Sequence, residues 1–207
     1  MLALAERAGL HGLVREHVKV PGTAGSNPAV KVGALVAGMV AGAHALEVMD
    51  LLRHGRMSRL ITAGRAPSTL GTFLRAFTFG YVRQLDAVAS GFLVNLVGMT
   101  PLLEEVDQVA YLDIDDTIKP TFGYQKQGAG YGYSGVRGLN AMVAVVSISV
   151  DVPVIVASRL RKCSTSSMNG YLMAPSTAPL IKNRWKTRYT IMSGAATIKV
   201  AAERSAH

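Results

Sequence analysis

The segment YLDIDDTIKP, residues 111–120, constrains the fold more than any other part of the chain. It alternates apolar and polar residues, and successive side chains of a β-strand point to opposite faces. A strand here would place Asp113 and Asp115 on one face and Asp116 on the other. The two carboxylates on one face would lie about 6.5–7 Å apart, close enough to line one site. The cluster therefore indicates either a solvated polar face or part of a metal site.

Composition indicates a folded chain with one domain or two small ones. Of 207 residues, 49% are hydrophobic and 17% charged, which is typical of a protein with a real core. The single cysteine, Cys163, excludes an internal disulfide framework and a zinc site built from cysteines alone. Glu6 and Arg7 interrupt the first apolar residues before a signal peptide could develop, so we expect a cytoplasmic protein.

Positive charge is concentrated near the C-terminus. Residues 1–158 carry 13 basic and 12 acidic side chains, whereas residues 159–207 carry 9 basic side chains and one acidic side chain, Glu203. A basic block favours polyanions, with nucleic acid ahead of an anionic membrane surface. The alternative is a solvated, irregular tail.

The N-terminal half shows helical periodicity. Residues 2–18 have near-helical spacing, and Gly9 and Gly12 favour two short pieces. A long helix is expected from residue 29 to residue 54. Its central run, 32–43, is apolar or glycine throughout but shorter than the roughly 20 residues that span a bilayer, so we expect a buried core helix and no membrane partner.

A second long helix is expected over residues 69–97, with breaks at Gly80 and Gly91. The connection before it, residues 53–65, is rich in arginine. Such a basic turn either contacts DNA or is simply solvated.

The hydrophobic period then changes from helical to strand-like. Residues 110–118, 141–149 and 153–160 read as three strands rich in β-branched residues, joined by turn residues. Strands in succession with short connections predict an antiparallel meander. The fold class is therefore α+β.

Several motifs together resemble bacterial insertion-sequence DDE transposases, especially the actinobacterial group. The central boxes LDIDDTI and FGYQKQGAGYGYSGVRGLNA carry most of the similarity, and MDLLRHG, APSTLGTFLRAFTFG, VRQLDAVA and PVIVASRLRK extend it over roughly residues 1–167. The resemblance implies an RNase H-like catalytic domain, dependence on Mg²⁺, recognition of terminal inverted repeats, and strand cleavage and transfer. It also implies a helical region at 1–108 with DNA binding, a partial catalytic domain at 109–167, and a divergent basic tail at 168–207.

The same resemblance assigns roles to the aspartates. The first catalytic Asp of such enzymes stands in an Asp-x-Thr context, which in this chain is Asp115, followed by Asp116 and Thr117. Asp115 is thereby the expected Mg²⁺ ligand and first catalytic residue, and Asp113 is the second candidate. Asp116 points away from them in a regular strand and ranks below both.

The segment QKQGAGYGYSG, residues 125–135, is the candidate DNA contact. A glycine-rich turn lets the backbone approach a phosphate, and Tyr131 and Tyr133 could stack on an unpaired base. Lys126 and Arg137 could contact the DNA backbone. The alternative is a tight hairpin whose tyrosines pack locally.

The chain departs from the family pattern after Asp116. A DDE site needs a second Asp and a Glu from later elements, yet only Asp151 and Glu203 are acidic after Asp116. We therefore expect a truncated or frameshifted transposase with very weak Mg²⁺ binding and no strand transfer. The alternative is a non-catalytic DNA-binding fragment that modulates a full-length transposase by occupying ends or forming mixed oligomers.

Overall fold

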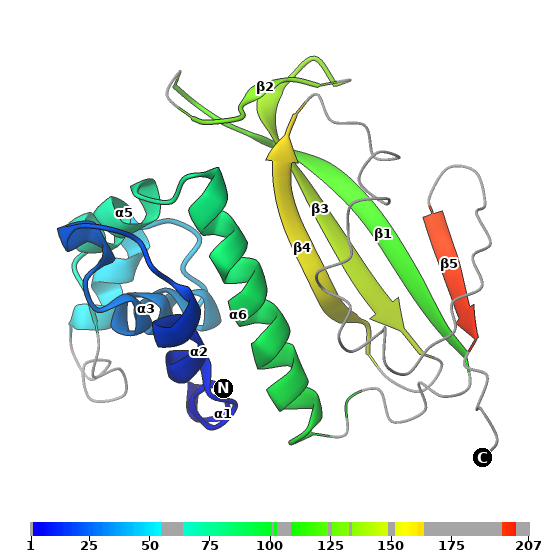
Figure 1. Cartoon of the computed structure of the whole chain (residues 1–207). Coiled ribbons are helices and arrows are strands. Elements are labelled where there is room, and N and C mark those ends of the chain that lie inside the picture. The colour runs from blue at the N-terminus through cyan, green and yellow to red at the C-terminus, as the bar shows by residue number, and fades with distance from the viewer. Residues whose placement is uncertain are drawn as a thin grey trace. The chain divides into compact units, whose positions relative to one another are not determined.

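The computed structural model follows the change of period in the sequence, with helices first and an antiparallel sheet after them (Figure 1). The prediction of a mixed α+β chain is confirmed. The chain divides into two units, residues 1–95 and residues 96–207. The structure describes residues 2–54, 64–100, 102, 109–123, 126–132, 134–148, 152–163 and 196–201.

The first unit is helical. Its elements are α1 (Leu2–Arg7), α2 (Leu10–His17), the 3₁₀ turn η1 (Thr23–Gly25), α3 (Pro28–Val40), the 3₁₀ helix η2 (Glu47–Arg53), α5 (Pro67–Arg75) and α6 (Phe79–Val97). The two short pieces expected at the N-terminus are present. Gly9 separates them with a backbone φ of 80°, a left-handed conformation that glycine adopts without a steric cost.

The prediction of one long helix over residues 29–54 is wrong, because α3 ends at Val40. Gly42 has a φ of 87°, and its N–H donates to the Met39 carbonyl while the Ala43 N–H donates to the Gly38 carbonyl. These two bonds form a Schellman motif, which stops a helix at a left-handed glycine. Among the described residues no helix is long and apolar enough to cross a membrane.

The prediction of a single helix over residues 69–97 is also wrong, and the helix does not break at either of the two glycines where a break was expected. The break lies between Arg75 and Phe79, while Gly80 and Gly91 lie inside α6. Gly91 instead permits close packing, since a Cβ there would lie 2.8 Å from a methyl carbon of Leu13.

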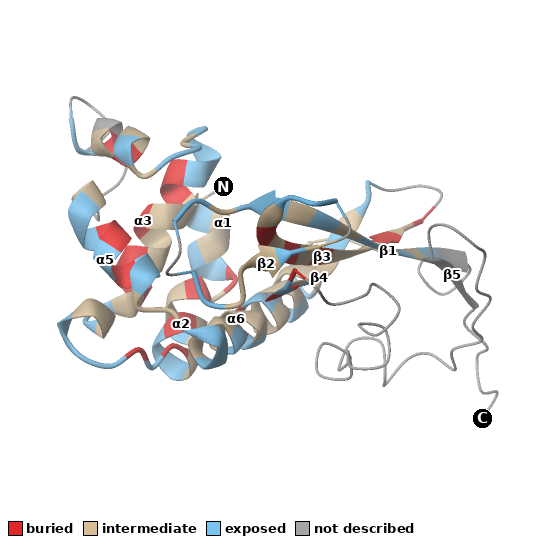
Figure 2. Cartoon of the chain, turned by 90° about the horizontal axis from the view of Figure 1, so that it is seen from above, coloured by how far each residue is buried: buried red, intermediate tan, exposed pale blue. Residues whose placement is uncertain are grey.

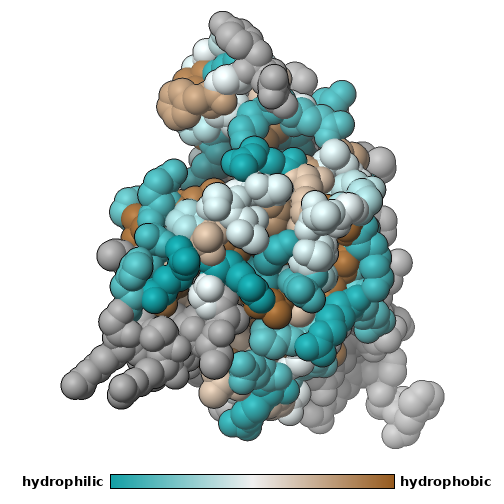
Figure 3. Space-filling model, turned by 90° about the vertical axis from the view of Figure 1, so that its left-hand side faces the viewer, coloured by the Kyte–Doolittle hydropathy of each residue, from teal (hydrophilic) through white to brown (hydrophobic). Residues whose placement is uncertain are grey.

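Two apolar clusters hold the helical unit together (Figure 2). The first contains Leu10, Val14, Val18, Val20, Ala29, Phe73 and Val88, and the second contains Ala34, Ala37, Met49, Leu52 and Leu70. Helix α3 contributes to both clusters, so its expected burial is confirmed in part: Ala34 and Ala37 are buried, whereas Met39 and Val40 at its end are exposed. On the face drawn in Figure 3 the hydrophobic areas are small and separated by hydrophilic ones.

The second unit contains the sheet. Its strands are β1 (Val109–Pro120), β2 (Gly130–Tyr131), β3 (Arg137–Ser147), β4 (Val154–Lys162) and β5 (Ala196–Ala201). The order is β2-β3-β1-β5, with β4 also paired to β3, and all the pairings are antiparallel. The expected meander of three strands is thus confirmed as β1, β3 and β4.

Strand β5 lies in the part of the chain that was expected to be an irregular basic tail, so that expectation is wrong for Ala196–Ala201. It pairs with the first half of β1, from Val109↔Ala201 to Ile114↔Ala196. Strand β1 therefore has neighbours on both sides over this half.

Candidate functional site

The three aspartates of β1 occupy opposite faces of the sheet, as the alternation predicts. Asp113 and Asp115 lie on the exposed face with Thr117, and Asp116 lies on the other face between Ile114 and Ile118. The side chain of Asp116 is only 10% exposed. The neighbouring carboxylates of Asp115 and Asp116 are thus in different environments.

The strand register sets the surroundings of the exposed pair. Asp115 lies opposite Val143, and Asp113 lies opposite Val145. An Asp115 carboxylate oxygen accepts the backbone N–H of Asp116 at 2.8 Å. No group of three or more His, Cys, Asp or Glu residues that could hold a metal occurs within the described part of the chain.

These observations decide how well Mg²⁺ fits. Mg²⁺ takes one or two carboxylates when substrate phosphates complete its shell, but two-metal phosphoryl transfer needs acidic ligands from several elements. Strand β1 offers Asp113 and Asp115 alone, and their register partners are Val143 and Val145 on β3 and Thr197 on β5, none of which is acidic. The other acidic candidates, Asp151 and Glu203, lie outside the described residues. The described residues do not fit a complete catalytic metal centre.

Asp116 belongs instead to a buried polar network. Its carboxylate accepts hydrogen bonds from the Asn140 amide at 3.0 Å and from the Arg161 guanidinium at 3.2 Å. The same guanidinium donates to the Asn140 carbonyl oxygen from Nη2 at 2.9 Å and from Nε at 3.2 Å. Three strands, β1, β3 and β4, are thereby linked through their side chains.

The network is buried enough to matter for stability. Asn140 is 2% exposed and Arg161 is 8% exposed. Removing one partner of a buried ion pair costs about 3–5 kcal/mol, because the remaining charge is left uncompensated in a poorly hydrated place. Asp116 is therefore a structural residue of the sheet. Sequence reasoning missed Arg161, which lies just past the predicted strand 153–160 and next to two other basic residues, Arg159 and Lys162.

The glycine-rich segment forms the turn that leads into β3. Gly130 pairs with Gly138 and Tyr131 with Arg137, and the Gly135 N–H donates to the Gly132 carbonyl at 3.1 Å. Gly138 lets two backbones meet, since a Cβ there would lie 2.4 Å from the Lys119 carbonyl oxygen. Within the segment, Gly128 and Gly135 have φ values of 79° and 68°, and a Cβ at Gly132 would lie 2.9 Å from the Cys163 sulfur. These three glycines have local structural causes, whereas a Cβ at Gly130 would meet nothing within 4 Å.

The candidate DNA-contacting residues have different environments. Lys126 is exposed and Tyr131 is 70% exposed, so Tyr131 does not pack locally. Arg137 is half-buried and donates from Nη1 to the Gly123 carbonyl at 2.6 Å, which ties its guanidinium to the loop after β1. Tyr133 lies outside the described residues. Sequence reasoning missed Phe122, which is 90% exposed in that loop.

Charge at this end of the sheet is of one sign. Residues 117–150 contain Lys119, Lys126 and Arg137 and no acidic residue.

Comparison with known protein families, with characterised proteins and with solved structures finds no match to this chain. Its function is therefore argued from its own residues.

Proposed function

We propose that this chain is a DNA-binding protein of the DDE-transposase type, which binds terminal inverted repeats and performs no strand transfer on its own. Its strands β1, β3 and β4 would then be the first three of an RNase H-like domain. The boxes LDIDDTI and FGYQKQGAGYGYSGVRGLNA support this relationship, as does the antiparallel pairing of the three strands. A full-length transposase is the expected protein partner, through mixed oligomers.

The observation that carries the proposal is the exposed turn between β1 and β3. Phe122 and Tyr131 are exposed aromatic residues that flank the exposed Lys126 in the sequence, within a stretch that has no carboxylate between Asp116 and Asp151. Aromatic side chains stack on bases of any sequence, and lysines contact phosphates. Such a surface suits an unpaired or frayed DNA end.

The absence of strand transfer is proposed from the aspartates. Asp113 and Asp115 supply two carboxylates on the exposed face, whereas the Asp116 carboxylate forms an ion pair with Nη2 of Arg161 at 3.2 Å. Asp115 is the residue most suited to metal contact, because its Asp-x-Thr context is that of the family. Weak Mg²⁺ binding without turnover is the expected behaviour.

Salt-dependent binding tests the proposal. Fluorescence anisotropy with labelled duplex and single-stranded DNA should give an affinity that falls steeply with salt, since phosphate contacts release counterions. Lys126→Ala should weaken binding and lower the salt slope by about one. Lys19→Ala is the control, because Lys19 is also exposed but lies after α2 in the helical unit.

The aromatic contribution has its own control. Tyr131→Ala should cost roughly 1–3 kcal/mol in binding to single-stranded DNA. Tyr111→Ala removes another exposed tyrosine from the opposite end of β1 and should change nothing. Absence of DNA binding at low salt would contradict the proposal. Equal losses of DNA affinity in Tyr111→Ala and Tyr131→Ala would also contradict it.

A further inference from the structure

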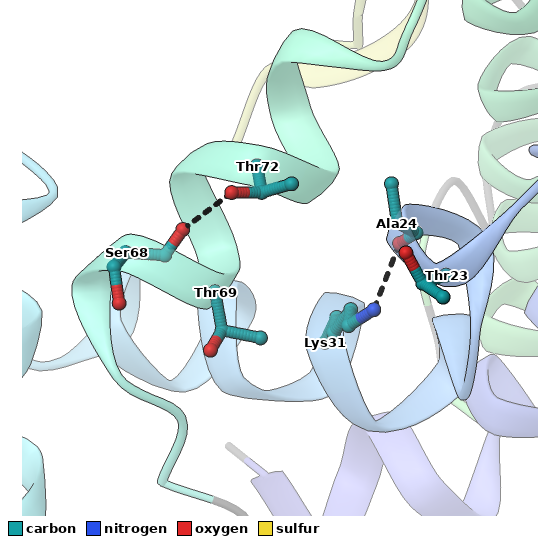
Figure 4. Close-up of a pocket in the computed structure, with 6 residues that line it drawn as sticks. All are labelled: Thr23, Ala24, Lys31, Ser68, Thr69 and Thr72. Carbon is teal, nitrogen blue, oxygen red and sulfur yellow. Dashed lines mark hydrogen bonds between the residues drawn. The ribbon is translucent and has the colours of Figure 1, made fainter.

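Lys31, a buried cation of the helical unit, already has hydrogen-bond partners within that unit. It lies at a small polar pocket (Figure 4) whose lining residues are Thr23, Ala24, Lys31, Ser68, Thr69 and Thr72. Its ammonium donates to the Ala24 carbonyl at 2.8 Å and to the Ser26 hydroxyl at 3.4 Å. These bonds link α3 to the turn η1, so the fold of the helical unit explains this buried charge.

The edge of β1 that faces β5 is only partly paired. Strand β5 pairs with this edge from Val109 to Ile114. No described strand pairs with the same edge from Asp115 to Pro120, although β3 pairs with the opposite edge as far as Pro120. An unpaired strand edge presents backbone N–H and C=O groups to which another strand can bind. The second half of β1 is therefore a candidate binding surface.

This half of β1 carries both signs of charge on one face. Asp115, Thr117 and Lys119 alternate along the strand and are all exposed, so their side chains share the exposed face of the sheet. Asp115 lies two residues before Thr117, and Lys119 lies two residues after it. When two copies of one strand pair antiparallel about a two-fold axis, each residue lies opposite the residue equally far beyond the axis in the second copy. With the axis at Thr117, Asp115 of each copy would lie opposite Lys119 of the other.

We propose that a second copy of the chain binds this edge, so that the β1 strands of the two copies run antiparallel across a two-fold axis at Thr117. An ion pair between Asp115 and Lys119 would form on each side of the axis, and the two Thr117 side chains would meet at the axis itself. Opposite charges, and threonines, placed directly across an antiparallel pair stabilise it. This dimer is a property of the sheet unit, and it does not depend on the DNA binding proposed above.

A hydrogen bond within β1 opposes this pairing. An Asp115 carboxylate oxygen accepts the Asp116 N–H at 2.8 Å, and such side-chain bonds to nearby backbone compete with a sheet ladder. In the dimer the carboxylate would turn to Lys119 of the second copy. Ile114, which pairs with Ala196, and Pro120, which has no N–H, limit the new ladder at its two ends. A short ladder that replaces an existing bond predicts a weak, reversible dimer.

The other outer strands of the sheet do not offer this charge complementarity. Strand β4, with the sequence VIVASRLRK, and strand β5, with the sequence ATIKVA, contain basic residues but no acidic residue. Self-pairing of either strand would therefore bring no opposite charges together in any register. The charge pattern favours β1 as the strand that meets its own copy.

Sedimentation equilibrium of the full chain, without DNA or Mg²⁺, is the first arm of the test. The chain should associate with rising concentration and stop at a dimer, because a two-fold pairing uses the same edge in both copies. Asp115→Lys places lysines opposite each other, and Lys119→Asp places aspartates opposite each other. Like charges directly across a strand pair repel, so each variant alone should self-associate about tenfold more weakly than the unaltered chain.

A mixture of the two variants is the second arm. Asp115→Lys has a lysine at both positions and Lys119→Asp has an aspartate at both, so every charged pair between the two unlike chains is again a pair of opposite charges. The mixture should form a heterodimer about as strong as the unaltered dimer, which a general loss of stability in either variant could not produce. Lys162→Asp is the matched control, because it reverses the charge of an exposed lysine on β4 and should leave self-association unchanged.

Three results would overturn the proposal. The first is an unaltered chain that stays monomeric at every concentration, since the edge of β1 would then bind no second copy. The second is a dimer that is equally strong in Lys119→Asp and Lys162→Asp, which would place the contact on another surface. The third is a mixture of Asp115→Lys and Lys119→Asp that does not associate, because the two positions would then not lie opposite each other.

Discussion

Replacing Asp116 by asparagine should destabilise the sheet unit, whereas the same change at Asp115 should not. The side chains of Asp116 and Arg161 are 10% and 9% exposed, so Asp116→Asn leaves a buried guanidinium without a counter-charge. The amide oxygen of asparagine can still accept the bonds from Asn140 and Arg161, so we expect a loss near the lower end of the 3–5 kcal/mol range. Asp115 is exposed, and its replacement should stay within about 0.5 kcal/mol.

Hydrogen exchange followed by mass spectrometry is the suitable assay, because it reports on each unit separately. Peptides covering β3 should exchange faster in Asp116→Asn, and peptides covering α2 should be unchanged and serve as an internal control. Combining Asp116→Leu with Arg161→Met should restore most of the stability that either change removes alone, since an apolar pair often replaces a buried ion pair without loss. Equal protection of β3 in Asp115→Asn and Asp116→Asn would refute this reasoning.

Three further predictions concern backbone geometry and pH. Gly138→Ala should destabilise β3 by about 1–3 kcal/mol, because its Cβ would lie 2.4 Å from the Lys119 carbonyl oxygen. Gly130→Ala is the control, because a Cβ at Gly130 would meet nothing within 4 Å. Hydrogen exchange of β3 measures the effect of both substitutions. Asn27 has a φ of 49°, so Asn27→Val should cost about 1–2 kcal/mol in chemical denaturation and Asn27→Gly should be nearly neutral. The pKa of Lys31 is lowered in the folded chain, so just below the usual lysine pKa of 10.5 the unfolded chain binds more protons than the folded chain. Stability should therefore rise with pH in this range. Thermal melts of Lys31→Met should not show that rise.

Local patterns were sufficient to predict the meander of β1, β3 and β4, but not β2 or β5. The alternation of Leu112, Asp113, Ile114 and Asp115 fixes which side chains share a face, since the period of a strand is two. The β-branched runs of β3 and β4 predict strands because such side chains suit a pleated, half-buried surface. The two exposed aspartates could therefore be placed from the sequence alone.

Contacts between distant residues could not be predicted in this way. Asp116 and Arg161 are 45 positions apart, and only the register of β1, β3 and β4 brings them together. Glycine is ambiguous for a similar reason. Gly42 ends a helix through its left-handed backbone, whereas Gly91 remains helical and accommodates Leu13.

One reaction tests the central claim, that the chain binds DNA but does not cut it. End-labelled duplex DNA is incubated with the full chain and Mg²⁺, and retention and cleavage are measured in the same sample over a range of salt concentrations. We predict retention that weakens steeply with salt and no cleavage product at any concentration. No retention at low salt, or products that Asp115→Asn abolishes, would contradict the account.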